Sequence, residues 1–450
     1  MRAALSSLFL SALPMGVFAK DDNGIPFEAC APLGAYYPPP TIDKNSEPFK
    51  KVIDKFTKSF DDLIENGGSP KYGPISINTT SFSVVIFGGG EHLRGDPVFF
   101  EYYYTSPEDQ ASNSNLTLNT RFPVGDVSMV FTVYAWLAKM GEQWESPITK
   151  YLPELAEVNT SFTAAWKDVT IGALAGHMSG LSRESGACTI GEPCDFKVSF
   201  ISSAKDLARA GHSMLASDLI SPAITRRWLH SDRDTSNLRN GVGKPWEVYR
   251  AGNAISPIVD ALTKSGTIGK YASYFGLTTD WNAGFAILAH DSSVKDRKLD
   301  LNVHADIVSE ILAYLQAIAA KELETRYAGY YEAKNAGAAF NTTVDGRGLE
   351  VQKLVVDKVD IKEKTAKTLG IKNKDLDFRI YPTNIRDEHR HQFIAVFQDR
   401  TALIDAGTPT CISWQEIGAE VDISVVFALN DGKVVGVDIP ALDVKMERAD

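Results

Sequence analysis

The chain has 450 residues, 44% of them hydrophobic, and a formal net charge of −11 at pH 7. This much apolar material is enough for a large core, which excludes a chain that is disordered throughout. Nucleic-acid binding is not expected either, because phosphate contacts need a basic surface and no block of Lys and Arg residues occurs. The length leaves room for two or three domains.

Residues 1–19 have the parts of a secretory signal peptide. Arg2 supplies the positive start, Ala3 to Gly16 are mostly apolar, and Val17-Phe18-Ala19 is a small-residue cleavage site. We therefore expect secretion, with cleavage after Ala19. No later stretch reaches about 18 apolar residues, so we expect a soluble mature protein without a membrane span.

Residues 20–326 alternate between helical and extended patterns. The spacing of apolar residues predicts helices at Phe49–Glu65, Val127–Met140, Pro153–Glu157, Ile171–Ala175, Ala204–Ala216 and Asp306–Leu323. Runs rich in β-formers predict strands at Ser81–Phe87, Val98–Tyr104, Ile255–Lys264, Tyr271–Leu277 and Ala283–Ala289. Asp126 stands where the helix that starts at Val127 would have its N-cap.

The pattern changes after Arg326. Short β-rich runs follow one another at Leu349–Val356, Phe378–Tyr381, Phe393–Phe397, Ile423–Leu429 and Lys433–Ile439. Asn430-Asp431-Gly432 is a strong hairpin turn between the last two of them. We place a domain boundary near residue 326 and expect residues 327–450 to form a small all-β domain.

The chain has four cysteines, which in an oxidising compartment suggest two disulfides; they are Cys30, Cys188, Cys194 and Cys411. Three pairings are possible. A local bridge across the turn-like segment between Cys188 and Cys194 is the simplest, and it leaves Cys30 to pair with Cys411. The N-x-[ST] sequons at Asn78, Asn115, Asn159 and Asn341 are candidate glycosylation sites.

Several short motifs occur in a recognisable order. His177-Met178-Ser179-Gly180-Leu181 comes first, Lys264-Ser265-Gly266 follows, and Ser273–Leu277 and Asn282–Phe285 come last. This order of motifs resembles that of the serine β-lactamase and penicillin-binding-protein family. It is most similar to the secreted fungal branch related to class C β-lactamases, which has an extra C-terminal β domain. The resemblance implies an α/β fold in which helices flank an antiparallel sheet, and a Lys264 that faces the substrate carboxylate.

The catalytic pair of that family is missing. Its nucleophile lies in S-x-x-K at the start of a buried helix, where a Lys one turn later takes the proton of the Ser hydroxyl. Here Asp126 stands at the Ser position and Met129 at the Lys position. A shifted register would pair Ser128 with Phe131, which cannot accept a proton, and Ser292–Lys295 is an S-x-x-K in a polar, turn-like stretch.

A third family element is also absent. Family members carry Y-x-N in a helical insert between the motifs that correspond here to His177–Leu181 and Lys264–Gly266. No Y-x-N occurs between Leu181 and Lys264. The segment from Phe200 to Leu207 resembles the one that comes directly after this insert in family members, so the insert is shortened close after Cys194. Either the protein lacks it, or the gene model has lost an exon.

Other readings of these residues remain open. Asp126 at a helix N-terminus would be stabilised as an anion, and we expect it to pair with Lys264 and repel anionic substrates. His177 is a packing histidine or a catalytic base, and Lys264-Ser265-Gly266 can also be read as a plain strand end. His389 and His391 lie near acidic residues, but charged surface clusters are commoner than metal sites, so no metal and no cofactor is predicted.

Three functions are compatible with this sequence. The leading hypothesis is a secreted β-lactamase-like protein that has lost serine acyl-enzyme chemistry and binds a small molecule or a partner. The second is an enzyme of a fungal natural-product pathway that uses the same site, with Asp126 and Lys264 as an acid–base pair or with hydrolase or transesterase chemistry. The third is an interaction protein that acts through its C-terminal β domain. The sequence gives no oligomeric state.

Overall fold

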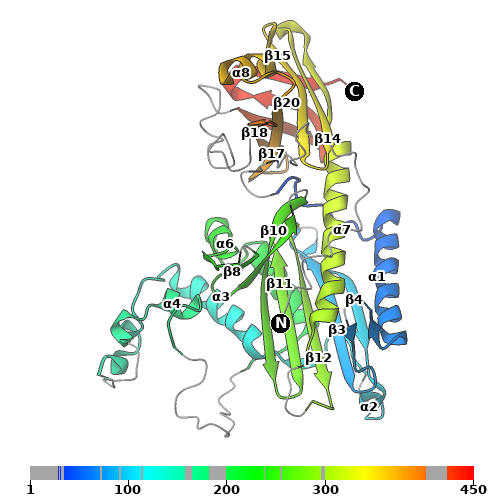
Figure 1. Cartoon of the computed structure of the whole chain (residues 1–450), viewed down its shortest axis with the longest axis vertical. Helices are drawn as coiled ribbons and strands as arrows, with labels where there is room; N and C mark the ends of the chain where they lie inside the picture. Colours follow the sequence, from blue (N-terminus) through cyan, green and yellow to red (C-terminus); the bar gives the residue numbers. More distant parts are fainter. Residues whose placement is uncertain are drawn as a thin grey trace. The chain divides into compact units, whose positions relative to one another are not determined.

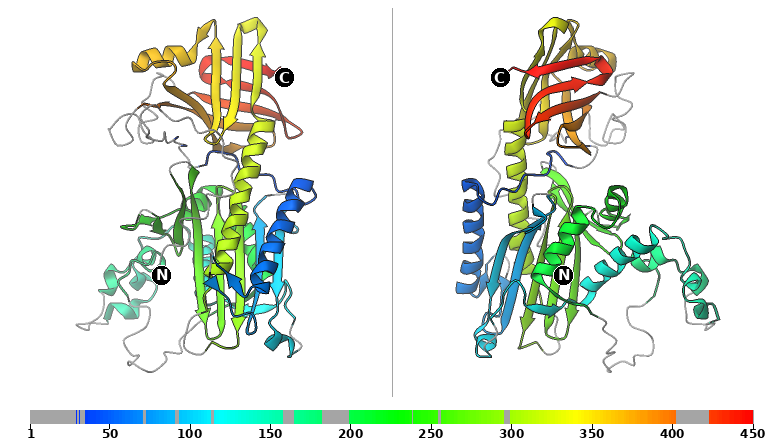
Figure 2. Two further views of the ribbon diagram at one scale, coloured as in Figure 1. Left: turned by 45° about the vertical axis from the view of Figure 1, so that its right-hand side comes forward. Right: turned by 180° about the vertical axis from the view of Figure 1, so that it is seen from behind.

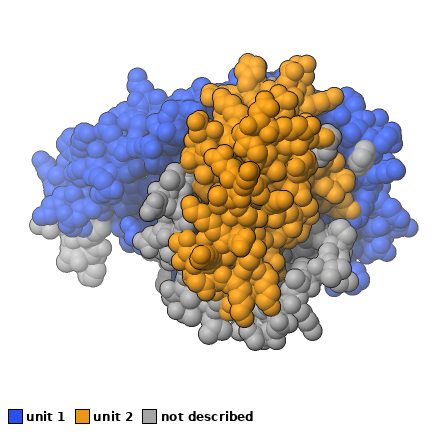
Figure 3. Space-filling view, turned by 90° about the horizontal axis from the view of Figure 1, so that it is seen from above, with its two compact units in different colours: residues 1–8, 41–251, 260–312 blue, residues 9–40, 252–259, 313–450 orange. Residues whose placement is uncertain are grey.

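The computed structural model describes residues 29, 31, 35–70, 73–90, 93–112, 115–157, 165–181, 199–237, 239–253, 256–294, 299–401 and 423–449 (Figure 1). The chain divides into two compact units (Figure 3). The first holds Thr41–Ala251 and Asp260–Leu312, and the second holds the described residues before Thr41 together with Gly252–Val259 and Ala313–Asp450. The division therefore falls inside one helix, between Leu312 and Ala313.

The first unit is built on an antiparallel eight-stranded sheet. In spatial order its strands are β4 (Val98–Tyr104), β3 (Thr80–Gly88), β12 (Ala283–Asp291), β11 (Tyr271–Thr278), β10 (Ser256–Ile268), β9 (Glu247–Asn253), β8 (Asn240–Val242) and β7 (Arg233–Asp234). Every residue of β3 is buried, which means that both faces of the sheet are covered there.

Helices cover the two faces of this sheet (Figure 2). The helices of the first unit are α1 (Glu47–Glu65), α2 (Pro107–Gln110), α3 (Ser128–Met140), α4 (Ile171–Ala175), α5 (Ala204–Leu215), α6 (Pro222–Trp228) and the first half of α7 (Asn302–Arg326). Helices α3 and α5 share one core cluster with β3, β11 and β12. On the opposite face the ring of Phe82 lies 6.1 Å from Phe60 of α1 and 4.3 Å from His304 of α7, measured between ring centroids.

Short elements complete the first unit. They are the strand pairs β1 (Gly68–Ser69) with β2 (Gly73–Pro74) and β5 (Arg121–Pro123) with β6 (Ile201–Ser203), and the 3-10 turns η3 (Gly125–Val127), η4 (Ile148–Lys150), η5 (Pro153–Glu157) and η6 (Trp166–Asp168). The β5–β6 pair brings the start of α3 close to the segment that leads into α5.

The second unit contains a closed antiparallel barrel of eight strands. Its strands run in the order β14 (Ala338–Asp345), β13 (Gly329–Ala333), β21 (Val444–Arg448), β20 (Lys433–Ile439), β19 (Ser424–Asn430), β18 (Arg390–Asp399), β17 (Leu376–Arg386) and β15 (Gly348–Val356), and β14 pairs again with β15. The short β16 (Val359–Asp360), the helix α8 (Ile361–Leu369) and the turns η7 (Lys334–Ala336) and η9 (Pro440–Leu442) are attached to it. Apolar side chains of the strands form one core cluster.

The expected fold class is confirmed, with differences in detail. The predicted helices and central strands lie within a few residues of their observed positions, but Pro153–Glu157 is a 3-10 turn and the all-β domain includes the helix α8. The expected N-cap is wrong: Asp126 lies inside η3, and α3 follows from Val127 without a side-chain cap. Strands β7 to β9 and helix α6 were not expected.

Helix α7 is the one helix of the described residues that is long and apolar enough to cross a membrane by length and composition. Most of its apolar window is buried inside the protein. Leu312 and Leu315 are 4% and 2% exposed, and Ala319 and Leu323 belong to the barrel core. Packing in a folded core therefore accounts for the apolar character of this helix.

Candidate functional site

The start of α3 meets the strand that carries Lys264-Ser265-Gly266. A Cβ atom on Gly266 would lie 2.3 Å from the carbonyl oxygen of Val124 and 2.8 Å from the backbone nitrogen of Asp126, so only glycine permits this approach. The Ser273 hydroxyl on β11 donates to the same Val124 oxygen at 2.7 Å. Two segments that are far apart in the sequence are thus brought together, as the family resemblance implied.

The residues at the positions of the family's catalytic pair can now be placed. Asp126 lies in the 3-10 turn η3, and Met129 follows in the first turn of α3 with 41% of its surface exposed. Ser128 between them is 8% exposed, and its hydroxyl oxygen accepts a hydrogen bond from the backbone N–H of Phe200 at 2.9 Å. The hydroxyl is therefore used to fix the β6 segment against α3.

Lys264 is held by a carboxylate that sequence reasoning missed. Its Nζ lies 2.6 Å from Oε1 of Glu247, the first residue of β9. The side chain of Lys264 is 6% exposed and that of Glu247 is 36% exposed. We expected Asp126 to be the partner of Lys264, whereas the structure pairs the lysine with Glu247. If the sequence had predicted β9 as the strand beside β10, Glu247 at its start would have been a candidate partner of Lys264.

Ser265 extends the same contact. Its hydroxyl lies 3.2 Å from Oε2 of Glu247, and its backbone N–H donates to that oxygen at 3.4 Å. The Lys-Ser pair of the motif therefore surrounds the carboxylate of Glu247 with an ammonium, an amide and a hydroxyl group. Charge-assisted hydrogen bonds of this kind are stronger than neutral ones.

Aromatic rings form the packed layer beneath these residues. Trp246 lies 5.4 Å from Trp228 and 6.4 Å from Phe275, and Trp228 stacks on Tyr134 of α3 at 5.2 Å, all between ring centroids. Trp246 and Phe275 are fully buried. Because Trp246 precedes Glu247 and Phe275 lies opposite Lys264 in the sheet register, this layer fixes the backbone on both sides of the ion pair.

His177 lies in the loop after α4, with a positive φ of 60°. Its Nε2 lies 2.9 Å from the carbonyl oxygen of Pro245, to which an imidazole N–H donates. This contact joins the loop to the residues just before β9. It gives the imidazole a bond to the main chain, as a packing histidine has.

Some predicted sites are exposed and others lie outside the described residues. Asn78 and Asn115 are exposed, and Asn341 is half-buried on β14. Asn159, Lys295 and all four cysteines (Cys30, Cys188, Cys194 and Cys411) lie outside the described residues, so their pairing and modification stay predictions. Ser292 of the alternative S-x-x-K lies in the turn after β12, and its hydroxyl donates a hydrogen bond to the carboxylate of Glu108.

The histidines of the C-terminal unit do not share a site. His391 is buried and its Nδ1 lies 3.0 Å from the Tyr327 hydroxyl, whereas the side chain of His389 is 76% exposed. Among the described residues no group of three or more His, Cys, Asp or Glu side chains is placed to hold a metal ion.

Two family models match the chain. Residues 93–190 match the model described as "Beta-lactamase", and residues 319–450 match the model described as "Beta-lactamase-like-like, C-terminal domain". A "Beta-lactamase-like protein" of Arthroderma benhamiae is 22% identical and covers 92% of this chain and 95% of its own length. That match spans 578 positions, more than the 450 residues here, so the relative has segments without a counterpart in this chain.

Solved structures of low identity are similar as well. The β-lactamase from Sulfitobacter sp. EE-36 is 15% identical and covers 60% of this chain and 99% of its own, with a TM-score of 0.42. The class C β-lactamase from Rhodobacter sphaeroides is 13% identical, with 58% and 99% covered and a TM-score of 0.40. The octameric penicillin-binding protein homologue from Pyrococcus abyssi is 12% identical, with 88% and 99% covered and a TM-score of 0.41.

Proposed function

Since this chain belongs to the serine β-lactamase-like family, we propose that it is a secreted member that forms no serine acyl-enzyme. It acts instead by binding a small molecule or a partner without covalent chemistry. The binding site is the place where η3 and the start of α3 meet Lys264-Ser265-Gly266. The observation that carries the proposal is that Asp126 and Met129 stand at the start of α3, where the family has its Ser and Lys.

The start of α3 has no activated nucleophile. Neither the carboxylate of Asp126 nor the thioether of Met129 can replace a Ser–Lys pair, because acyl-enzyme formation needs an attacking hydroxyl and a base that takes its proton. Ser128, between Asp126 and Met129, carries a hydroxyl, and this hydroxyl accepts a hydrogen bond from the N–H of Phe200. The residue three positions after it is Phe131, which cannot accept a proton. Acyl transfer is therefore unsupported in either register.

The ion pair at Lys264 is a second argument against acyl-enzyme formation. An uncompensated lysine would attract the carboxylate of a β-lactam, but Glu247 already neutralises it at 2.6 Å. Because this pairing engages Lys264, the structure adds no support to an acid–base pair of Asp126 with Lys264.

The proposal is tested by intact mass spectrometry of the secreted, deglycosylated protein. The protein is incubated with a panel of β-lactams and activated esters, and the double variant Asp126→Ser/Met129→Lys is treated in parallel. Ser128→Ala serves as the control for labelling at the neighbouring hydroxyl. The mass of the untreated protein also tests cleavage after Ala19, and its mass before deglycosylation tests the sequons.

We expect no adduct on the wild-type protein. A wild-type adduct that persists would overturn the proposal and make the protein an ordinary serine hydrolase. An adduct on the double variant alone would mean that the site has kept its architecture and lost only its nucleophile and base. If neither protein is labelled, the shortened insert has removed more of the site than the catalytic pair, and a scaffold or interaction role is favoured.

A further inference from the structure

Two arginines without a carboxylate partner lie at the end of the barrel where β17 turns into β18. Arg326 is the last residue of α7 and is half-buried, and Arg386 is the last residue of β17 and is exposed. Neither guanidinium has a carboxylate oxygen within 4.0 Å among the described residues. By contrast, Arg379 and Arg400 of the same barrel each bond two carboxylates.

Tyr327 and His391 connect these two arginines. The guanidinium carbon of Arg326 lies 5.7 Å from the centroid of the Tyr327 ring. The Tyr327 hydroxyl lies 3.0 Å from Nδ1 of His391, which is directly opposite Arg386 in the β17–β18 register. Side chains of directly opposite residues in an antiparallel pair are neighbours on one face of the sheet. Arg326, Tyr327, Arg386 and His391 therefore form one cluster within the second unit.

The acids that follow Arg386 in the sequence have partners of their own. Asp387 lies 3.2 Å from Nη2 of Arg390, and it also accepts the backbone N–H of His389 at 2.8 Å. Glu388 lies 3.3 Å from Nε2 of His389. These contacts hold both carboxylates in the β17–β18 turn, so the turn does not neutralise Arg386.

The end of α7 does not satisfy Arg326 either. An arginine in the last turn of a helix commonly interacts with the final carbonyl groups of that helix. Here Arg448 of β21 donates to the carbonyl oxygens of Arg326 and Ala328 at 2.7 and 2.9 Å. Nε of Arg326 is buried and has no hydrogen-bond partner among the described residues. A buried N–H without an acceptor costs free energy, so Arg326 keeps donors for an acceptor that these residues do not supply.

Repulsion between the two guanidinium groups is a cost that a bound anion would remove. Although the Arg386 side chain reaches solvent, burial by the protein around it lowers its pKa, and the positive charge of Arg326 lowers that pKa further. Burial, together with the charges of both arginines, also lowers the pKa of His391 to about 4. The imidazole is therefore neutral at pH 7, and Tyr327 and His391 are an uncharged support between two like charges.

We propose that Arg326 and Arg386 together bind a phosphate group at this end of the barrel. Two guanidinium groups suit this ligand, because each offers a planar fork of N–H donors and a phosphate carries several acceptor oxygens and up to two negative charges. The phosphate belongs to a soluble small molecule or to a lipid headgroup, which are recognised by the same chemistry. The site is built from the second unit alone and does not rest on the function proposed for the start of α3.

The test is calorimetric titration of the full chain with sodium phosphate at pH 7.5 and constant ionic strength. Sodium acetate and sodium chloride are the comparison anions. Arg326→Gln/Arg386→Gln removes both guanidinium groups of the cluster. Arg390→Gln is the matched control, because it removes a guanidinium from the same hairpin that already has a carboxylate partner.

We expect saturable binding of phosphate to the wild type, at least about tenfold weaker in the double variant and changed by less than about threefold in Arg390→Gln. Equal phosphate affinities of the wild type and the double variant would overturn the proposal. An equal loss in Arg390→Gln would overturn it too, because binding would then follow the net charge of the hairpin. If the double variant does not fold, Arg386→Gln, a change at an exposed position, is judged by the same criterion.

Vesicle sedimentation separates the two sources of the phosphate group. The protein is mixed with phosphatidylcholine vesicles that either contain or lack phosphatidic acid. Sedimentation with phosphatidic acid that is lost in Arg386→Gln assigns a lipid headgroup, whereas binding of inorganic phosphate without sedimentation assigns a soluble ligand. If the protein neither binds inorganic phosphate nor sediments with phosphatidic acid, the proposal is wrong.

Discussion

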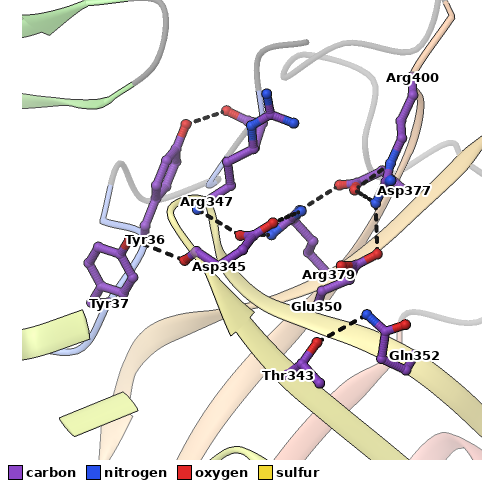
Figure 4. A network of polar contacts seen from close by, with 11 residues as sticks. Tyr36, Tyr37, Thr343, Asp345, Arg347, Glu350, Gln352, Asp377, Arg379 and Arg400 are labelled. Carbon is purple, nitrogen blue, oxygen red and sulfur yellow. Dashed lines mark hydrogen bonds and ion pairs between the residues drawn. The ribbon is translucent and has the colours of Figure 1, made fainter. Parts of the chain in front are cut away.

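At the scale of single residues, a buried arginine organises one end of the barrel. Arg379 is 1% exposed, and its guanidinium donates to both carboxylate oxygens of Asp345 at 2.6 and 2.7 Å and to Asp377 at 2.8 Å (Figure 4). Arg400 bonds Asp377 and Glu350 from the other side. These charges join β14, β15 and β17, and each buried ion has an opposite charge beside it.

Arg379→Met should therefore destabilise the barrel. It leaves the buried Asp377 with one arginine fewer, and breaking a buried pair costs about 3–5 kcal/mol. The measurement is hydrogen exchange of the β14 and β17 amides, which should speed up. Lys321→Ala is the control: its pair with Glu324 is exposed on both sides, so the loss should stay under about 1 kcal/mol. Equal effects of the two variants would show that the Arg379 network adds no more than a surface pair.

A buried histidine makes the first unit sensitive to acid. His304 is 1% exposed, and neither ring nitrogen has a hydrogen-bond partner among the described residues. Burial lowers the pKa of its imidazole from 6.5 to about 4. Between these values the unfolded chain binds a proton that the folded protein does not. The contribution of His304 to the free energy of unfolding is therefore fully present above pH 6.5. It decreases as the pH drops toward 4, by at most about 1.4 kcal/mol per pH unit.

His304→Phe should flatten this dependence, since a phenyl ring fills similar space beside Phe82 and does not titrate. The check is thermal unfolding followed by tryptophan fluorescence from pH 7.5 to 4.5, for both proteins. His389→Gln, a change at an exposed position, should leave the slope as in the wild type. A slope that is the same for His304→Phe would mean that other groups cause the acid sensitivity.

At the scale of elements, the approach of β10 to the start of α3 defines the site. A methyl group at Gly266 would meet Val124 and Asp126 at distances that no side chain tolerates. Gly266→Ala should push η3 away from β10 and cost about 1–3 kcal/mol of stability. Gly95→Ala is the matched control, because a Cβ there meets nothing within 4 Å and no positive φ is required.

Thermal unfolding of Gly266→Ala and Gly95→Ala tests whether β10 and η3 need this close approach. A drop in the unfolding temperature for Gly266→Ala alone supports a tight junction between β10 and η3, which is the place where the acyl-labelling experiment looks for a reactive site. If Gly266→Ala unfolds at the wild-type temperature, β10 and η3 separate easily and the site is looser than its distances indicate.

The elements also show where sequence reasoning succeeds. The apolar spacing of α3 and α7 and the β-rich runs of β10 to β12 are strong local signals, and their positions were predicted closely. Strand β9 has a mixed composition, and its pairing depends on β10, which no local pattern reveals. Glu247 was missed for the same reason: its partner lies 17 residues away and is set by strand register. Motif order located Lys264 but not its counter-charge.

At the scale of the whole molecule, the barrel core is assembled from distant parts of the chain. Tyr37 from the N-terminal segment and Ala319 and Leu323 from α7 lie in the same buried cluster as the barrel strands. The boundary expected near residue 326 falls at the end of α7, after these contributions. Residues 327–450 alone would therefore lack part of the core that stabilises them, which matters for any fragment used to test the interaction hypothesis.

Tyr37 provides the sharpest test of this arrangement. It is 7% exposed and its hydroxyl lies 3.5 Å from the backbone oxygen of Asp345, 308 residues away. Tyr37→Ala should remove buried aromatic surface and cost the barrel about 3–5 kcal/mol, seen as faster hydrogen exchange in β14 and β15. Tyr330→Ala removes the same kind of ring from a position that is 38% exposed and should change exchange far less. If the two variants behave alike, the N-terminal segment rests on the barrel without stabilising it, and the strands and α7 suffice for its core.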